Sequence, residues 1–226
     1  MLPLTLMVFF LMRKIAMKLK TPLFNPLVFS VIILIPILFA TKTSYAEYFG
    51  NVRIIHELLP YSVVALAYPL YELTPQIKLR WKSIIFITFI ATMASMMSGV
   101  FIAFWLGASP EIAASVLPKS VTTAIAVIIA ENQGGIPSIA ALCVILVGTL
   151  GAVIGHQVLN LFRIKQPFAR GLSIGAVSHA VGTARCLEVD YEEGSYSSLS
   201  LVLCGIMTSL IAPFLFPIML IVATYF

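Results

Sequence analysis

Long apolar stretches dominate the chain, and the short segments between them hold nearly all of its charges. Four stretches contain no Asp, Glu, Lys or Arg: residues 21–41, 83–110, 132–162 and 194–226. Each is at least as long as the roughly 20 apolar residues that a helix needs to cross a bilayer. Backbone polar groups find no water in lipid, and the runs lack the apolar–polar alternation of barrel strands. The pattern therefore predicts an all-α, polytopic helical membrane protein.

Three shorter apolar segments, at 58–71, 112–130 and 171–184, are rich in Gly, Pro, Ser or Thr. Each is too short or too interrupted for a regular span, which is typical of broken or re-entrant membrane helices that face protein or a wet cavity. Residues 1–12 are too few to span alone and are expected to form a short first membrane helix or an interfacial segment. In total we expect about six or seven membrane segments.

An internal repeat is visible at two of the interrupted segments. Residues 59–63 (LPYSV) and 117–121 (LPKSV) agree at four of five positions, and the same offset aligns the long apolar stretches that follow. Paired, proline-interrupted segments at corresponding positions are typical of transporters built from inverted repeats. We therefore expect a single integral membrane domain, 1–226, with repeat halves at roughly 21–110 and 111–226.

The charged segments predict the orientation of the chain. Residues 13–20, 78–82 and 163–170 carry net charges of +4, +3 and +3, whereas 188–193 holds four acids and no base. The positive-inside rule places the three basic segments in the cytoplasm and the acidic segment outside. The number of membrane crossings fits this orientation if 112–131 is a re-entrant hairpin that enters and leaves on one side. If 112–131 crosses the membrane fully, the basic segment 163–170 falls outside. We prefer the hairpin, because the long apolar stretches of the two repeat halves then run in opposite directions.

Composition excludes several classes of function. Only 10% of the residues are charged, against about 25% in soluble domains. The net charge of +5 lies in short loops, where orientation explains it better than nucleic-acid binding. We expect no metal and no cofactor, and the absence of hydrolase, metalloprotease and nucleotide-binding motifs predicts a protein that is not an enzyme. Three cysteines without paired spacing are expected to be small buried residues: Cys143, Cys186 and Cys204.

The first group of candidate site residues surrounds Lys119, a charge within the apolar sequence VLPKSVTT. Pro118 is expected to start a half-helix, with the hydroxyls of Ser120, Thr122 and Thr123 in its first turn. A lysine, several hydroxyls and a helix N-terminus together form a site for a small anion. The alternative is a lysine that extends to the membrane interface beside a helix start.

The second group lies in SHAVGTAR at 178–185 and consists of His179, Thr183 and Arg185. Arg185 could form a bidentate pair with a carboxylate, and His179 could donate a hydrogen bond or relay a proton. Alternatively, His179 packs in the interior and Arg185 marks a helix end. We expect a small substrate to bind between the two groups, which should then lie within about 10 Å of each other.

Other polar and small residues receive a structural interpretation. His156 is expected to pack at a helix end. The acidic run is expected to form a solvated outer loop: Glu188, Asp190, Glu192 and Glu193. Close helix packing explains the glycines at 148, 151, 155, 171 and 175, which have small-xxx-small spacing.

Several motifs recur in order along nearly the whole chain and carry a family resemblance: NPL at 25–27, AYPLY at 67–71, LPKSVTT at 117–123, GGIP at 134–137, GAVIG at 151–155, ARG at 169–171 and SHAVGTAR at 178–185. Through them the chain resembles the LrgB/CidB family of bacterial inner-membrane proteins. It departs from the family pattern at Ala124 and His156, where the family usually has proline.

The resemblance implies an antiholin-like or holin-like protein that modulates murein hydrolases and autolysis beside a smaller LrgA/CidA-type membrane partner. Related proteins carry pyruvate in bacteria and glycolate and glycerate in chloroplasts. The residues favour transport, because a holin-like pore has no use for paired broken helices, a lysine at a half-helix start and a His/Arg cluster. We expect a transporter, or a transporter subunit, for small 2-oxo or 2-hydroxy monocarboxylates, which could also assemble with copies of itself; the holin-like regulator is the alternative.

Overall fold

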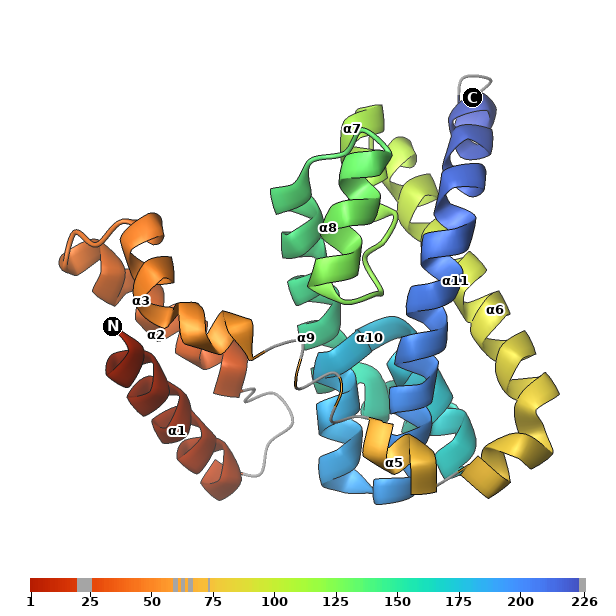
Figure 1. The fold of residues 1–226 in the computed structure, drawn as a ribbon, viewed down its shortest axis with the longest axis horizontal. Helices are drawn as coiled ribbons and strands as arrows, with labels where there is room; N and C mark the ends of the chain where they lie inside the picture. The colour runs from red at the N-terminus through yellow and green to blue at the C-terminus, as the bar shows by residue number, and fades with distance from the viewer. Residues whose placement is uncertain (20–25, 59–60, 62–63, 65–66, 73, 224–226) are drawn as a thin grey trace. The chain divides into compact units, whose positions relative to one another are not determined.

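The computed structural model describes residues 1–226 except 20–25, 59–60, 62–63, 65–66, 73 and 224–226, and every regular element in this described part is a helix (Figure 1). The chain divides into two units, Met1–Ala65 and Leu66–Phe226. Three helical segments are long and apolar enough to cross a membrane: Ile77–Trp105, Pro137–Leu161 and Tyr191–Ala223. The all-α class predicted from the sequence is confirmed.

The first unit contains α1 (Leu2–Leu19), α2 (Pro26–Ala40) and α3 (Tyr45–Glu57). α1 packs against α2 through a small apolar cluster that includes Val8, Met12 and Leu34. The helix does not end with the apolar residues 1–12 but continues through the basic ones, which makes it longer than expected. The predicted span at 21–41 appears as the apolar helix α2, whose 15 residues are fewer than a span needs; residues 21–25 lie outside the described part.

The second unit contains α5 to α11: α5 (Ala67–Glu72), α6 (Thr74–Trp105), α7 (Pro110–Val116), α8 (Thr123–Asn132), α9 (Pro137–Leu161), α10 (Pro167–Val189) and α11 (Tyr191–Ala223). Proline occupies the first position of α7, α9 and α10, where its missing N–H costs no hydrogen bond. The long apolar stretches become α6, α9 and α11, as predicted. The LPYSV segment at 59–63 lies largely outside the described residues, so the repeat based on it stays a prediction.

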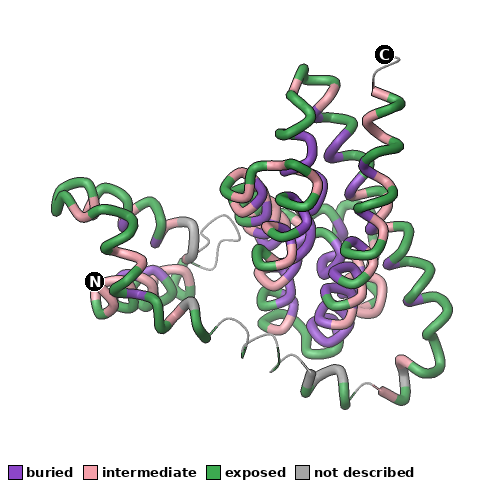
Figure 2. The backbone as a smooth tube through the Cα atoms, turned by 45° about the horizontal axis from the view of Figure 1, so that its top comes forward, coloured by how far each residue is buried: buried purple, intermediate pink, exposed green. Residues whose placement is uncertain are grey.

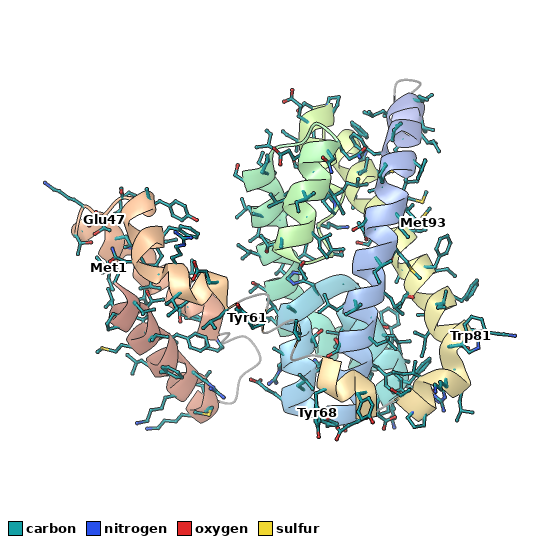
Figure 3. All side chains as sticks on the ribbon, in the orientation of Figure 1. Met1, Glu47, Tyr61, Tyr68, Trp81 and Met93 are labelled. Carbon is teal, nitrogen blue, oxygen red and sulfur yellow. The ribbon has the colours of Figure 1, made fainter. Side chains whose placement is uncertain are left out.

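α6 and α11 run in the same direction, and α9 runs against them. Ile84 early in α6 shares a cluster with Tyr196 early in α11, and Val100 late in α6 shares another with Phe216 late in α11. These two clusters form the two ends of the core. Buried residues concentrate where the helices face one another, whereas the outer side of α6 is exposed (Figure 2).

α7 and α8 form a first helical hairpin. α7 ends at Val116, six residues form an irregular tip at 117–122, and α8 then returns beside it. The arms are tied where α8 ends, because the backbone N–H of Ile136 donates to the buried Ser115 hydroxyl at 2.7 Å. The interrupted form predicted for 112–130 is confirmed.

α10 folds into a second hairpin, with a first arm at 167–178 and a second at 180–189. His179 has φ 40° and ψ −138°, outside the helical region. Beyond it the chain returns: a Cβ on Gly182 would lie 2.8 Å from Ile174, and Cys186 shares an apolar cluster with Ile174. In a straight helix, residues 174 and 186 would be about 18 Å apart. The predicted break at 171–184 is therefore confirmed, and it reverses the chain.

The second hairpin overturns part of the predicted orientation. Arg170 donates from Nε to Glu193 Oε2 at 2.8 Å, so the basic segment 163–170 and the acidic segment 188–193 lie at the same end of the bundle. The positive-inside rule had placed them on opposite sides because one segment is basic and the other acidic. The hairpin instead returns to the end at which it began.

The described part of the second unit has an inverted internal arrangement. α6 is followed by the first hairpin, which packs at the Val100–Phe216 end of the core. α9, of opposite direction, is followed by the second hairpin, whose Leu172 packs at the Ile84–Tyr196 end. Each helix–hairpin pair is the approximate inverse of the other, and the hairpins enter the bundle from opposite ends.

Candidate functional site

The two hairpin tips meet beside α9 around Val144, about a third of the way along this helix. The Val144 side chain packs with Val121 of the first tip. Its carbonyl oxygen lies 2.8 Å from His179 Nε2 of the second tip. Two segments that are far apart in the sequence are thus brought to the same part of the bundle interior.

A narrow hollow lined by hydroxyl-bearing and apolar side chains lies beside this meeting point. In this conformation it is too narrow to admit a water molecule. Its walls come from the first tip, the first arm of α10, α6 and α11: Thr92, Ser95, Met96, Leu117, Pro118, Ser120, Ala176, Cys204 and Thr208. A ligand could enter only if one hairpin tip moved.

Lys119 brings a positive charge to the edge of this hollow. Its Nζ donates to the backbone carbonyl of Ser95 and to the Ser95 hydroxyl, the latter at 3.0 Å. The Ser95 hydroxyl is also 2.6 Å from that of Ser120. The ion pairs of the described residues leave Lys119 without a carboxylate partner. A cation without a counter-ion, among hydroxyls and largely out of water, suits a small anion.

One detail of the expected half-helix is wrong. Pro118 lies in the turn that follows α7, and α8 begins at Thr123 with Thr122 as its N-cap. The Thr122 side chain makes no capping hydrogen bond, and Thr123 is exposed. Ser120 alone of these three hydroxyl residues lines the hollow, because the turn at 118–121 delays the start of the helix.

His179 and Thr183 are both buried at the second tip. The Thr183 hydroxyl donates to the His179 carbonyl at 2.8 Å and lies 2.8 Å from the Ser197 hydroxyl of α11. Gly148 leaves the space that the His179 ring occupies, since a Cβ there would collide with it. His179 thus serves as a packing residue that fixes the tip, the alternative interpretation of the sequence; a direct role in binding stays a prediction.

Arg185 lies apart from the hollow. Its Nη1 donates to Glu188 Oε2 at 3.0 Å, and the two side chains are 43% and 62% exposed. The position agrees with a residue at a helix end near the acidic loop. The structure therefore brings Ser120 and Lys119 to the hollow and His179 beside it, but not Arg185, whose part in binding stays a prediction.

Sequence reasoning missed a charged cluster at the base of the second hairpin. Glu193 is buried, with 3% of its side chain exposed, and contacts Arg170 at 2.8 Å and His156 at 2.5 Å. The prediction that Glu193 lies in a solvated outer loop is therefore wrong. Donor atoms of His156, Cys186 and Glu193 all lie within 4.8 Å of one another. The signal in the sequence was Arg170, which directly precedes the Gly-rich segment 171–184, because a charge beside an apolar segment needs a buried partner.

Comparison with known proteins identifies the family. The model of the LrgB-like family matches residues 5–218. The chain belongs to the LrgB family. An uncharacterized protein of Haemophilus influenzae is 45% identical over 213 residues, 94% of this chain and 92% of its own. The holin-like protein CidB of Staphylococcus epidermidis is 34% identical over 223 residues, 95% of this chain and 94% of its own.

A third relative, the uncharacterized protein YwbG of Bacillus subtilis, is 33% identical over 216 residues, 96% of each chain. No solved structure matches the chain. Family membership and the three long apolar helices together make this a bacterial membrane protein of LrgB type. The resemblance seen in the sequence motifs is confirmed.

Proposed function

We propose that this LrgB-family chain is a carrier in the bacterial inner membrane, crossing it several times, that moves small 2-oxo or 2-hydroxy monocarboxylates such as pyruvate, glycolate or glycerate. It would be a transporter, alone or as a subunit, and not an enzyme. The observation that carries the proposal is Lys119, a cation without a carboxylate partner among the described residues, at the tip of a broken hairpin.

The hairpin arrangement supports transport around a central site. Both tips reach the same part of the bundle interior, with Ser120 and Ala176 lining one hollow. Irregular backbone at membrane depth is tolerated where it lines a site inside the protein. Because the hairpins enter from opposite ends, withdrawing one tip would open the hollow to one side and withdrawing the other would open it to the opposite side.

The hydroxyls that line the hollow favour a small polar substrate. Hydroxyls of Ser95, Ser120 and Thr208 surround it, and they could donate to the oxo or hydroxy group of a substrate whose carboxylate lies against Lys119. An LrgA/CidA-type small membrane protein is the expected partner, and assembly with further copies of the chain is compatible with the exposed apolar side chains of α6.

The alternative is a holin-like regulator of murein hydrolases. The name of the Staphylococcus epidermidis relative, holin-like protein CidB, favours it. A holin-like pore would pass solutes without saturation and without selection between stereoisomers. A carrier binds one substrate at a time and must therefore saturate.

Uptake of radiolabelled pyruvate, glycolate and D- or L-glycerate into proteoliposomes of the purified chain, with and without an LrgA/CidA-type partner, tests the proposal. We expect saturable uptake that distinguishes glycerate enantiomers, and no release of a trapped dye. Lys119→Gln should weaken apparent affinity about tenfold to a hundredfold, the effect of losing a charge-assisted hydrogen bond.

Lys165→Gln is the matched control, because Lys165 is an exposed residue of a loop and loses the same charge. It should behave as the parent chain does. Unsaturable flux with dye release would support the holin-like alternative. Unchanged uptake by correctly folded Lys119→Gln would exclude the lysine from the site.

A further inference from the structure

The Glu193 cluster lies where four segments converge at the base of the second hairpin. His156 comes from α9, Arg170 from the first arm of α10, Cys186 from the second arm and Glu193 from α11. Each carboxylate oxygen of Glu193 has its own partner: Oε2 accepts from Arg170, and Oε1 contacts His156 Nε2. The cluster therefore connects both arms of the hairpin to the helices on either side.

Arg170 is fully engaged in this cluster. Besides Glu193, it donates from Nη1 to the Asn160 side-chain oxygen at 2.8 Å and to the Ile164 carbonyl at 3.0 Å. Its charge neutralises the carboxylate of Glu193. With His156 neutral, the three side chains carry no net charge, which is the state that an apolar environment favours.

His156 is the group of the cluster that can gain a proton near neutral pH. Its Nδ1 is buried and has no hydrogen-bond partner among the described residues. Its Nε2 lies 2.5 Å from Glu193 Oε1, close enough for the pair to hold a proton, although the two atoms form no hydrogen bond in this conformation. A further proton on Nδ1 would make the ring a cation, and the cluster would then carry one positive charge.

A metal ion fits this geometry less well. His156, Cys186 and Glu193 are suitable ligand types. Two atoms bound to one tetrahedral ion at 2.0–2.1 Å, however, lie about 3.3 Å apart, so the contact of 2.5 Å leaves no position for an ion between them. Arg170 also already neutralises Glu193. The geometry favours a proton.

Charged groups around the cluster affect how readily His156 binds this proton. Arg170 and Arg185 both bring positive charge near His156, and these charges oppose a further proton on its ring. Asp190 accepts the backbone N–H of Glu193 at 2.8 Å and supplies a negative charge. The Cys186 thiol completes the set.

We propose that His156, paired with Glu193, binds the proton that is carried together with a monocarboxylate. This proposal rests on the proposed transport function. One proton and one carboxylate anion add no net charge to the loaded carrier, and a carrier without added charge moves at lower cost through an apolar membrane. Because the proton lies at the base of the hairpin whose tip borders the hollow, the second hairpin connects the two binding events.

The stoichiometry gives a quantitative expectation. In proteoliposomes with the membrane potential held at zero, an inward gradient of one pH unit should accumulate the substrate about tenfold, because one pH unit is worth a factor of ten in equilibrium. The accumulation should not change when a membrane potential is imposed. Each substrate anion that enters should bring one proton into the lumen, as measured with a pH-sensitive dye there.

His156→Gln keeps hydrogen-bonding capacity and removes the titration. We expect it to exchange substrate across the membrane without a gradient, but to accumulate none in response to one. His156→Asn is the second variant if glutamine does not fit. Glu188→Gln, an exposed carboxylate, is the control and should accumulate as the parent does.

Each result bears on one proposal. If substrate accumulation by the parent does not depend on the pH gradient, or if His156→Gln still responds to the gradient, the proton site is overturned and the transport proposal is unaffected.

If the parent shows no saturable uptake at all, the transport proposal is wrong. The proton site is then judged by thermal unfolding between about pH 5 and 8: different pH profiles for parent and His156→Gln support it, and identical profiles overturn it. Zinc stabilisation of the parent that Cys186→Ser abolishes would show a metal site instead.

Discussion

The two hairpins share one outline, but the charges that they draw away from solvent lie at opposite ends. The first hairpin carries the half-buried Lys119 at its tip, and its base packs into an apolar cluster that includes Ala113 and Phe216, with Glu111 and Glu131 exposed outside it. The second has a tip without a formal charge, closed by glycine packing around His179, and its base holds the Arg170–Glu193 pair. A charge at a base is neutralised by the fold, whereas the charge at the tip is left for a ligand.

This difference matters because charge is expensive inside a membrane protein. A buried ion pair stabilises the fold only while both partners are present. A lone cation at a tip stabilises the fold little, and a charge at membrane depth is costly enough to indicate a functional role. The base of the second hairpin should therefore be essential for stability, and the tip of the first should be dispensable for it.

The largest effect is expected at the base of the second hairpin. Arg170→Ala leaves the buried Glu193 carboxylate without its cation, which costs about 3–5 kcal/mol of unfolding free energy. Unfolding in mixed micelles of increasing SDS content measures the loss. The control is Arg185→Ala: its pair with Glu188 is 43% and 62% exposed, so less than about 1 kcal/mol is expected. Equal losses in the two variants would contradict the comparison.

The next effect concerns the tip of the second hairpin. Gly148→Ala places a methyl group against the His179 ring, which must then leave the Val144 carbonyl. We expect a loss of about 1–3 kcal/mol, typical of overpacking, in the same SDS titration.

Gly155→Ala is the matched control on the same helix. Its new Cβ would be 3.6 Å from Ile174, an ordinary contact. Because alanine is the better helix former, this variant should be neutral or more stable by up to about 1 kcal/mol. A destabilisation as large as that of Gly148→Ala would show that the loss in Gly148→Ala does not come from the collision with the His179 ring.

The sequence could predict the long helices and the places where the hairpins break. Apolar length identifies α6, α9 and α11 without knowledge of their neighbours. The interruption at Pro118 and the Gly-rich run at 171–184 mark breaks because these residues interrupt a helix locally. Lys119 was recognisable because a lone charge in an apolar run is conspicuous. These features depend on residues close together in the chain.

What the sequence could not predict depends on distant residues. The reversal of α10 occurs at His179, whose unusual backbone is held by Val144 and the space above Gly148, more than 30 positions away. Glu193 looked like one of four solvated acids, and only the reversal brings Arg170 to it across 23 positions. The orientation error followed from the same missing reversal.

A moderate effect is expected at the base of the first hairpin. The buried Ser115 hydroxyl accepts the Ile136 backbone N–H at 2.7 Å, so Ser115→Ala leaves that N–H without its partner. The expected loss is about 1–2 kcal/mol. Ser98→Ala, at an exposed serine of α6, should change stability by less than about 0.5 kcal/mol. A loss in Ser115→Ala as small as in its control would show that the hydroxyl does not tie the arms.

The smallest effect on stability is expected at Lys119. Lys119→Met keeps an unbranched apolar side chain beside Gly99 and removes the charge. Nothing buried loses its last partner: the Ser95 hydroxyl keeps its contact with Ser120 at 2.6 Å, and the Ser95 carbonyl lies within α6, where the helix supplies a donor. Unfolding in SDS should shift by no more than about 0.5 kcal/mol, whereas carboxylate uptake should fall sharply. A destabilisation approaching that of Arg170→Ala would mean that the lysine holds the tip in place, and the contrast between a structural base and a ligand-binding tip would fail.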